Sequence, residues 1–175
     1  MGFSVTMASS IVLAGLILFT GSLFMSLLYS LYTSIGVMAT YVDGEKARLG
    51  VKLEAEIEDV GNFSIQLNVK NVGSKPIFLQ EDGYRWNSII VSYNTSTSRW
   101  VTYLIEDYTI LEVRVTGTNV SFNPAGHRFL EPGEEARIAF HLPNGAPEIP
   151  AGGVVTVVFA SHYGVSARDE AVRGG

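Results

Sequence analysis

The chain has 175 residues, no cysteine and a formal net charge of −5. The lack of cysteine excludes disulfides, thiolate catalysis and cysteine-ligated zinc or iron–sulfur sites. Lysine and arginine are scattered singly in this acidic chain, which argues against a nucleic-acid partner, because phosphate binding requires a clustered basic face. Beyond an apolar N-terminal segment, roughly 130 residues are left, enough for one domain of the usual size.

The N-terminal segment has the composition of a membrane helix. Residues 1–42 carry no charged side chain, and the apolar stretch from Ile11 to Leu31 is as long as the roughly 20 residues that a bilayer crossing requires. The alternative, a cleaved signal peptide, would have a basic residue before a shorter apolar run. We therefore predict one transmembrane helix and stalk over 1–42 and a linker over 43–50; the family resemblance described below implies that the helix is pilin-like.

Small residues recur at four-residue spacing along this predicted helix. The row consists of Ser10, Ala14, Ser22, Ser26, Ser30 and Ser34, and it is interrupted by Leu18. Small side chains at this spacing let a second helix approach closely. The row predicts a helix-association face, and the alternative is a hydrophobic anchor with incidental serines.

From Val51 onward the hydrophobic period changes to two, which is typical of half-buried strands. The predicted strands are Val51–Ile57, Asn62–Lys70, Ile77–Leu79, Ser88–Tyr93, Trp100–Ile105, Ile110–Val115, Ala136–Leu142 and Val154–Ser161. The last is apolar on both faces, so we expect it to be central and covered on both sides. Short strands separated by turn residues favour a sandwich or a barrel, and we predict an all-β, immunoglobulin-like β-sandwich over 51–167, with a flexible tail over 168–175.

Three sequons for N-glycosylation occur, at Asn62, Asn94 and Asn119. Asn94 stands in a polar stretch and is the preferred candidate. Used sequons would place the domain outside the cytoplasm; chance occurrence in a chain rich in asparagine and serine is the alternative.

No pattern in the chain indicates catalysis. His127, His141 and His162 are far apart and lack the local spacing of metal ligands, so we expect solvated or partner-facing side chains. Glu54, Glu56 and Glu58 alternate along one predicted strand and are interpreted as a solvated face. There is no phosphate-binding loop and no nucleophile elbow. The sequence predicts no enzyme, no cofactor and no metal.

Aromatic residues gather in the middle of the chain, around two tryptophans. Aromatics at strand spacing are usually core or cross-strand pairs. The sharper hypothesis is an exposed patch for a protein partner, and its candidate residues are Trp86, Tyr93 and Trp100.

The first residues also resemble a known family. Met1–Val5 (MGFSV), Ala8–Ser10 (ASS) and Ile11–Ile17 (IVLAGLI) resemble the start of the archaellum protein F family, FlaF or ArlF. Leu67–Gly73 (LNVKNVG) and Leu130–Glu134 (LEPGE) resemble segments found in many archaeal surface sandwiches.

The resemblance implies a stator component of the archaellum, anchored in the cytoplasmic membrane by one span. It places the β domain in the pseudoperiplasm, bound to S-layer protein, with the sister protein FlaG and a second copy of the chain as further partners. The alternatives are an archaellin or type IV pilin filament subunit and a membrane-tethered ligand-binding module. Filament subunits carry a basic residue and a glycine before the helix, whereas only Met1 precedes Gly2 here. We therefore expect the chain to keep its N-terminus.

Overall fold

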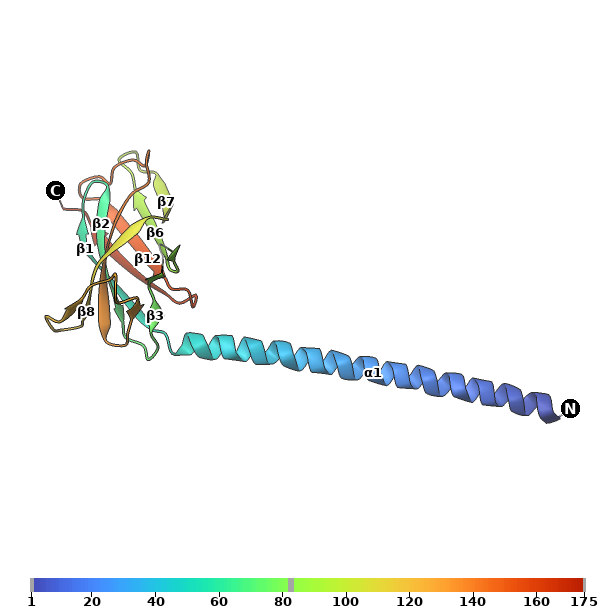
Figure 1. Ribbon diagram of the computed structural model, residues 1–175. Helices are drawn as coiled ribbons and strands as arrows, with labels where there is room; N and C mark the ends of the chain where they lie inside the picture. Colours follow the sequence, from blue (N-terminus) through green and yellow to red (C-terminus); the bar gives the residue numbers. More distant parts are fainter. Residues whose placement is uncertain (1, 82–83, 175) are drawn as a thin grey trace. The chain divides into compact units, whose positions relative to one another are not determined.

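The computed structural model describes residues 2–81 and 84–174. It separates the chain into two compact units, Met1–Lys46 and Ala47–Gly175. Figure 1 shows the first as the coiled ribbon of α1 and the second as a β-sandwich.

Helix α1 runs over Gly2–Leu49. Its 48 residues correspond to about 72 Å at 1.5 Å per residue, against a hydrocarbon core of about 30 Å. Within the described part of the chain, the segment Thr6–Lys46 is the one helix long and apolar enough to cross a membrane. Residues 43–49 of the predicted linker continue the helix, because no proline interrupts them and Glu45, Lys46 and Arg48 are good helix formers.

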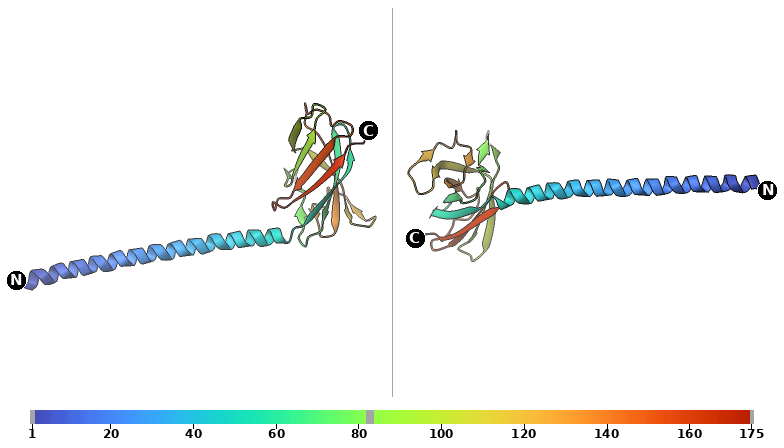
Figure 2. Two further views of the ribbon diagram at one scale, coloured as in Figure 1. Left: turned by 180° about the vertical axis from the view of Figure 1, so that it is seen from behind. Right: turned by 90° about the horizontal axis from the view of Figure 1, so that it is seen from below.

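The second unit contains two main antiparallel sheets (Figures 1 and 2). The five-stranded sheet has the order β1 (Leu53–Val60), β2 (Ser64–Asn71), β11 (Glu134–His141), β8 (Tyr108–Val115), β9 (Ser121–Phe122). The four-stranded sheet has the order β13 (Ser166–Val172), β12 (Val154–Ala160), β6 (Ser88–Asn94), β7 (Trp100–Ile105). Two short pairs add β10 (Phe129–Leu130) to β3 (Ile77–Phe78) and β4 (Gln80–Glu81) to β5 (Tyr84–Arg85).

The core lies between the two main sheets. Its fully buried side chains come from both, and include Ile65, Leu67 and Val69 of β2, Val91 and Tyr93 of β6, and Val157 and Phe159 of β12. Burying one such side chain stabilises the fold by about 1.5–3 kcal/mol. The alternation in the sequence therefore marks the side chains that face the core, and the prediction of an immunoglobulin-like β-sandwich behind an N-terminal apolar helix is confirmed.

The C-terminal segment differs from the sequence prediction. Residues 168–175 were expected to be a flexible tail, but β13 pairs with β12 from Ala160↔Ser166 to Val154↔Val172. Its polar residues have structural partners, since the Asp169 carboxylate accepts a 2.7 Å hydrogen bond from the backbone N–H of Ile57. The sequence does not show whether a charged side chain accepts a hydrogen bond from the backbone of a neighbouring edge strand, as Asp169 does, or only contacts water.

Strand β12 is central in its sheet but is covered on one side only. Val155, Val157 and Phe159 are buried, whereas Val154 is exposed and Val158 is half-buried. The expectation that this strand is covered on both faces is therefore wrong. Its outward valines leave an apolar surface open on the four-stranded sheet.

Asn71 joins the two segments that resemble archaeal surface sandwiches. Its buried side-chain amide donates 2.8 Å hydrogen bonds to the carbonyls of Leu130 and Lys75, and its Oδ1 accepts from the Gly73 N–H at 3.0 Å. Its own carbonyl accepts from the Gly133 N–H at 2.9 Å. These segments thus have a structural role: they tie the turn after β2 to the loop before β11.

Candidate functional site

The histidines do not form a reaction centre. The Nε2 atom of His127 lies 2.9 Å from Glu134 Oε2, and its ring stacks on Phe122. His141 is exposed at the end of β11, and burial lowers the pKa of His162, which packs against Tyr163. Across residues 2–81 and 84–174, no group of three or more histidine and carboxylate side chains is placed to hold a metal ion.

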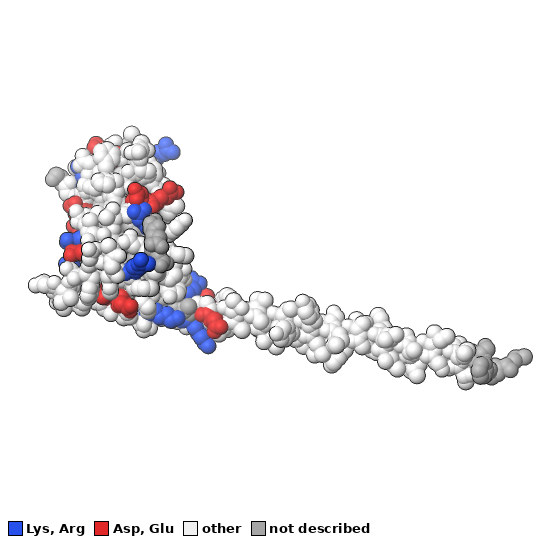
Figure 3. Space-filling model, viewed as in Figure 1, with Lys and Arg blue, Asp and Glu red and all other residues white. Residues whose placement is uncertain are grey.

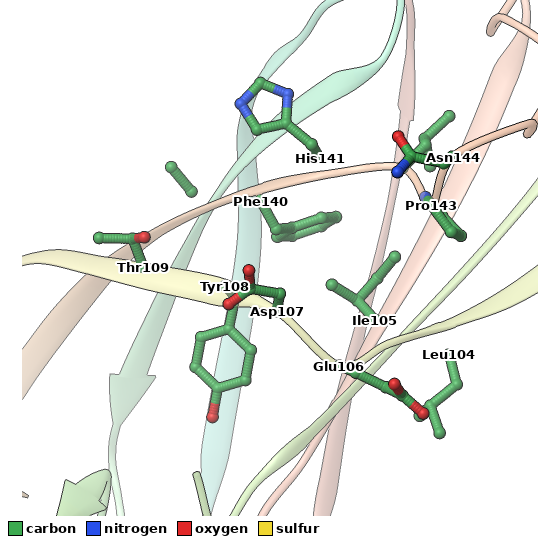
Figure 4. Close-up of a pocket in the computed structure, with 12 residues that line it drawn as sticks. Leu104, Ile105, Glu106, Asp107, Tyr108, Thr109, Phe140, His141, Pro143 and Asn144 are labelled. Carbon is green, nitrogen blue, oxygen red and sulfur yellow. The ribbon is translucent and has the colours of Figure 1, made fainter. Parts of the chain in front are cut away.

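An open pocket of about 560 Å³ lies where the end of β7, the start of β8 and the end of β11 meet (Figure 4). Its apolar lining includes Leu104, Ile105, Phe140 and Leu142. Figure 4 shows the His141 imidazole standing apart from the carboxylates of Glu106 and Asp107, and Asp107 is bound by Arg85 at 2.8 Å. The lining therefore provides no convergent set of polar groups, and we assign no reaction to this pocket.

Tyr93 does not belong to any surface, which corrects the sequence prediction. Its side chain is 0% exposed, and its hydroxyl donates a 2.5 Å hydrogen bond to the Pro147 carbonyl. Burial, with a smaller contribution from the neighbouring Tyr103, raises the pKa of Tyr93 to about 12. The alternation of β6 points this ring inward, so it is a core residue.

The two tryptophans are exposed but lie on different surfaces. Trp86 is 54% exposed and Trp100 is 59% exposed. In the β6–β7 hairpin, Trp100 pairs with Asn94 at one end, while Trp86 precedes the other end, where Ile89 pairs with Ile105. About 17 Å of strand separates these ends at 3.3–3.4 Å per residue. The predicted cluster of Trp86, Tyr93 and Trp100 is thus one core residue and two separate surfaces.

Trp86 belongs to an aromatic patch, which we define as Phe78, Trp86 and Phe129. The Phe78 ring meets Trp86 edge-on with centroids 5.8 Å apart, and Phe129 with centroids 5.0 Å apart. Strand pairing of β10 with β3 places Phe129 opposite Phe78. Sequence reasoning missed Phe129 because it lies far along the chain, and no local pattern marks a two-residue pairing.

The residues on either side of Trp86 are held firmly. Asn87 is buried; its Nδ2 donates to the Phe78 carbonyl at 2.9 Å and its Oδ1 accepts from the His162 N–H at 3.2 Å. Arg85 binds Asp107, and its guanidinium lies 4.9 Å from the centre of the Tyr108 ring. The aromatic patch is therefore preorganised, so its own side chains would lose little conformational entropy when a partner binds.

The sequons differ in accessibility. Asn94, the preferred candidate, is the last residue of β6 and is half-buried, with its Oδ1 buried. Asn62 is exposed, and its Oδ1 accepts a 2.6 Å hydrogen bond from Arg173. Asn119 is exposed in the turn between β8 and β9. The geometry favours Asn119 as an acceptor, and glycosylation of any of the three stays a prediction.

The row of small residues on α1 is fully exposed. Ser10, Ala14, Ser22, Ser26, Ser30 and Ser34 all lie on the helix surface, and the Ser10 hydroxyl donates to the Thr6 carbonyl at 2.9 Å. Figure 3 shows this helix white along most of its length, without charges. A row of i, i+4 positions is inclined by about 26° to the helix axis, so one crossing helix would contact a few neighbouring members such as Ser22, Ser26 and Ser30.

Comparison with known proteins supports the fold through structure alone. No protein-family model and no curated protein sequence matches the chain. The structure is similar to the archaeal flagellum of Methanospirillum hungatei strain JF1, with a TM-score of 0.62 and 11% identity over 96% of this chain and 93% of that chain.

Two solved structures from Sulfolobus acidocaldarius match the chain more weakly. The archaellum periplasmic stator protein FlaG gives a TM-score of 0.44 at 11% identity, over 69% of this chain and 99% of that chain. The archaellum periplasmic stator protein complex of FlaF and FlaG gives 0.43 at 11% identity, over 68% and 87%. Both scores are below 0.5, so the similarity of fold rests on the flagellum.

Proposed function

We propose that this chain is a non-catalytic structural protein of the archaellum, of the FlaF stator type. The observation that carries the proposal is the order of its parts: a membrane-length apolar helix followed by a sandwich, the same order over which the archaeal flagellum aligns with 96% of the chain. In this proposal α1 crosses the cytoplasmic membrane once and the sandwich lies in the pseudoperiplasm.

A stator must hold against torque, which requires a membrane tether and a rigid head bound to something immobile. The antiparallel sheets supply a rigid head, because neighbouring strands are hydrogen-bonded along their length. The preorganised aromatic patch supplies a contact of the kind that dominates binding energy in protein interfaces. We propose S-layer protein as the partner of this patch, and FlaG and a second copy of the chain as partners within the motor.

A filament subunit is the second candidate function. It is favoured by the same match to the archaeal flagellum, which covers the helix as well as the sandwich. In this role α1 would pack among other helices inside a filament instead of crossing a membrane.

Binding of isolated S-layer protein tests the stator proposal. We expect full-length protein in nanodiscs to bind it, and to do so in the presence of a metal chelator. Trp86→Ala should weaken binding by roughly 30-fold, about 2 kcal/mol, with little change in melting temperature, because the side chain is half exposed. Phe63→Ala is the matched control, because this aromatic side chain is 46% exposed, precedes β2 and lies outside the aromatic patch, and it should leave binding unchanged. No affinity of the intact protein for S-layer protein would refute the assignment.

Fractionation of cells separates the stator from the filament subunit. After archaella are sheared from cells that produce a tagged chain, a stator stays with the membranes and a filament subunit leaves with the filaments. The intact mass gives a second measurement, since cleavage ahead of the apolar helix favours the filament subunit.

A further inference from the structure

Strand β7 is an open edge of the sandwich. It is the terminal strand of the four-stranded sheet and pairs with β6 alone among the sheet strands. Alternate residues of an edge strand point their N–H and C=O groups away from the sheet. Among residues 2–81 and 84–174, no further backbone hydrogen bond involves positions 100–105. The edge therefore offers a row of backbone donors and acceptors to an added strand.

This edge lacks the usual protection against strand addition. Natural edges carry charged residues, proline or bulges, whereas Trp100–Ile105 reads WVTYLI and pairs with β6 without a register shift. The other edge of the same sheet is protected: β13 carries Arg168, Asp169 and Glu170, and Asp169 is bound to β1. A β-branched and aromatic segment without charges is the composition that pairs most readily.

The charges at the two ends of β7 favour one kind of partner. Arg99 precedes the strand, and Glu106 follows it. When two copies of this strand pair antiparallel, each Arg99 lies near the acidic end of the other copy. Parallel pairing would instead place like charges together. The edge is thus electrostatically complementary to itself in the antiparallel orientation.

The side chains select a register. Trp100, Thr102 and Leu104 share the outward face of β7, and Trp100 and Leu104 are 59% and 55% exposed. Directly opposed residues of an antiparallel pair lie on the same face. With Thr102 opposite itself, each Trp100 lies opposite Leu104 of the second copy, so both exposed apolar side chains become covered. A register centred on Tyr103 would place Trp100 opposite Glu106 instead.

We propose that β7 pairs antiparallel with β7 of a second copy of this chain, about a two-fold axis at Thr102, and forms one continuous eight-stranded sheet. This identifies the surface for the self-association included in the proposed function, but it needs neither S-layer protein nor a motor. A five-residue pairing is a small interface. Tethering the chains to one membrane raises their effective concentration and would compensate for that size.

A single cysteine tests the register, because the native chain has none. The Cβ atoms of directly opposed residues are about 4.5–5.5 Å apart, close enough for a disulfide after a small shift. We expect full-length Thr102→Cys in proteoliposomes to form a disulfide-linked dimer under mild oxidation. Thr156→Cys is the matched control, a threonine on the outward face of the same sheet but on interior strand β12, and should stay monomeric. Equal cross-linking of both variants, or of neither, overturns the proposal.

Opposite charges at the axis give a second, independent measurement. Thr102→Lys and Thr102→Glu both lose the 2.8 Å hydrogen bond to Ser92 and place charges of opposite sign at the axis. Each alone should lose at least tenfold in dimer formation by analytical ultracentrifugation, and their mixture should recover it as a heterodimer. If the mixture does not recover, or if Thr102→Cys in native membranes cross-links to a different protein instead, the second copy is the wrong partner. The proteoliposome and ultracentrifugation experiments contain no S-layer protein, so their outcomes are independent of the S-layer test.

Discussion

The outward faces of the two main sheets differ in charge. On the five-stranded sheet, aligned side chains alternate in charge across β1, β2, β11 and β8, in the row Glu54, Lys70, Glu135, Arg114. The Arg137 guanidinium binds Glu58 at 2.5 Å and Glu112 at 3.5 Å in the neighbouring row. On the four-stranded sheet, the outward side chains of β6, β7 and β12 carry no charge, and the charges are on β13.

The charged side chains of the five-stranded sheet therefore bind one another, whereas the outward side chains of the four-stranded sheet are available to a protein partner. Charges that pair with one another already have partners, and charged side chains discourage strand addition and apolar contact. Exposed tryptophan, leucine and valine beside hydroxyl groups lose water at little cost when a partner covers them. The partner-binding functions that we propose lie on the four-stranded sheet and on the aromatic patch, and none lies on the charged face.

The largest expected effect comes from the polar contact that fastens the five-stranded sheet to the β3–β10 pair. Asn71→Ala removes three side-chain hydrogen bonds and leaves buried carbonyls without partners, so we expect a loss of about 3 kcal/mol or more in urea unfolding. Asn68→Ala is the matched control on the same strand, with one 3.3 Å hydrogen bond to Glu135, and should cost about 1 kcal/mol. Equal losses would show that Asn71 has no special role in joining the segments.

A smaller effect is expected from alkaline titration of Tyr93, the buried tyrosine of β6 in the four-stranded sheet. The pKa of Tyr93 is raised to about 12, so its neutral form stabilises the fold fully below pH 10, and this stability is lost as pH rises from 10 to 12. Tyr93→Phe should reduce that loss, although not abolish it, because burial also raises the pKa of Tyr108.

Near neutral pH the same change should cost about 1 kcal/mol, through the lost hydrogen bond to Pro147. Chemical unfolding at pH 8, 10 and 12 measures both parts. An unchanged pH dependence in the variant would mean that another group titrates.

The smallest effects are expected on the outward charges. Arg137→Ala should lower stability by about 1 kcal/mol or less, because its ion pairs are partly exposed, and the loss should shrink in high salt. Arg168→Ala, on the more exposed pair of β13, should change stability by less than about 0.5 kcal/mol. Thermal unfolding at two salt concentrations compares them, and a large salt-independent loss for Arg137 would show a packing role.

The hydrophobic pattern predicted the main elements because each pattern reflects local chemistry. The uncharged segment up to Val42 indicates a helix in an apolar environment, and alternation such as Ile65, Leu67 and Val69 indicates strands with one buried face. The same alternation could have predicted that Tyr93 is buried, since its ring shares the inward face of β6 with Ile89 and Val91.

Only the tertiary structure decided which residues meet. The sequence by itself determined the class of each part, the absence of cysteine chemistry and the inward positions, because these depend on composition and short-range periodicity. The aromatic patch, the Asn71 hydrogen bonds and the order of the strands depend on contacts between distant segments, such as Phe78 with Phe129 and Asp169 with Ile57. The same holds for β7, whose uncharged sequence becomes an open edge only because the fold places it last in its sheet.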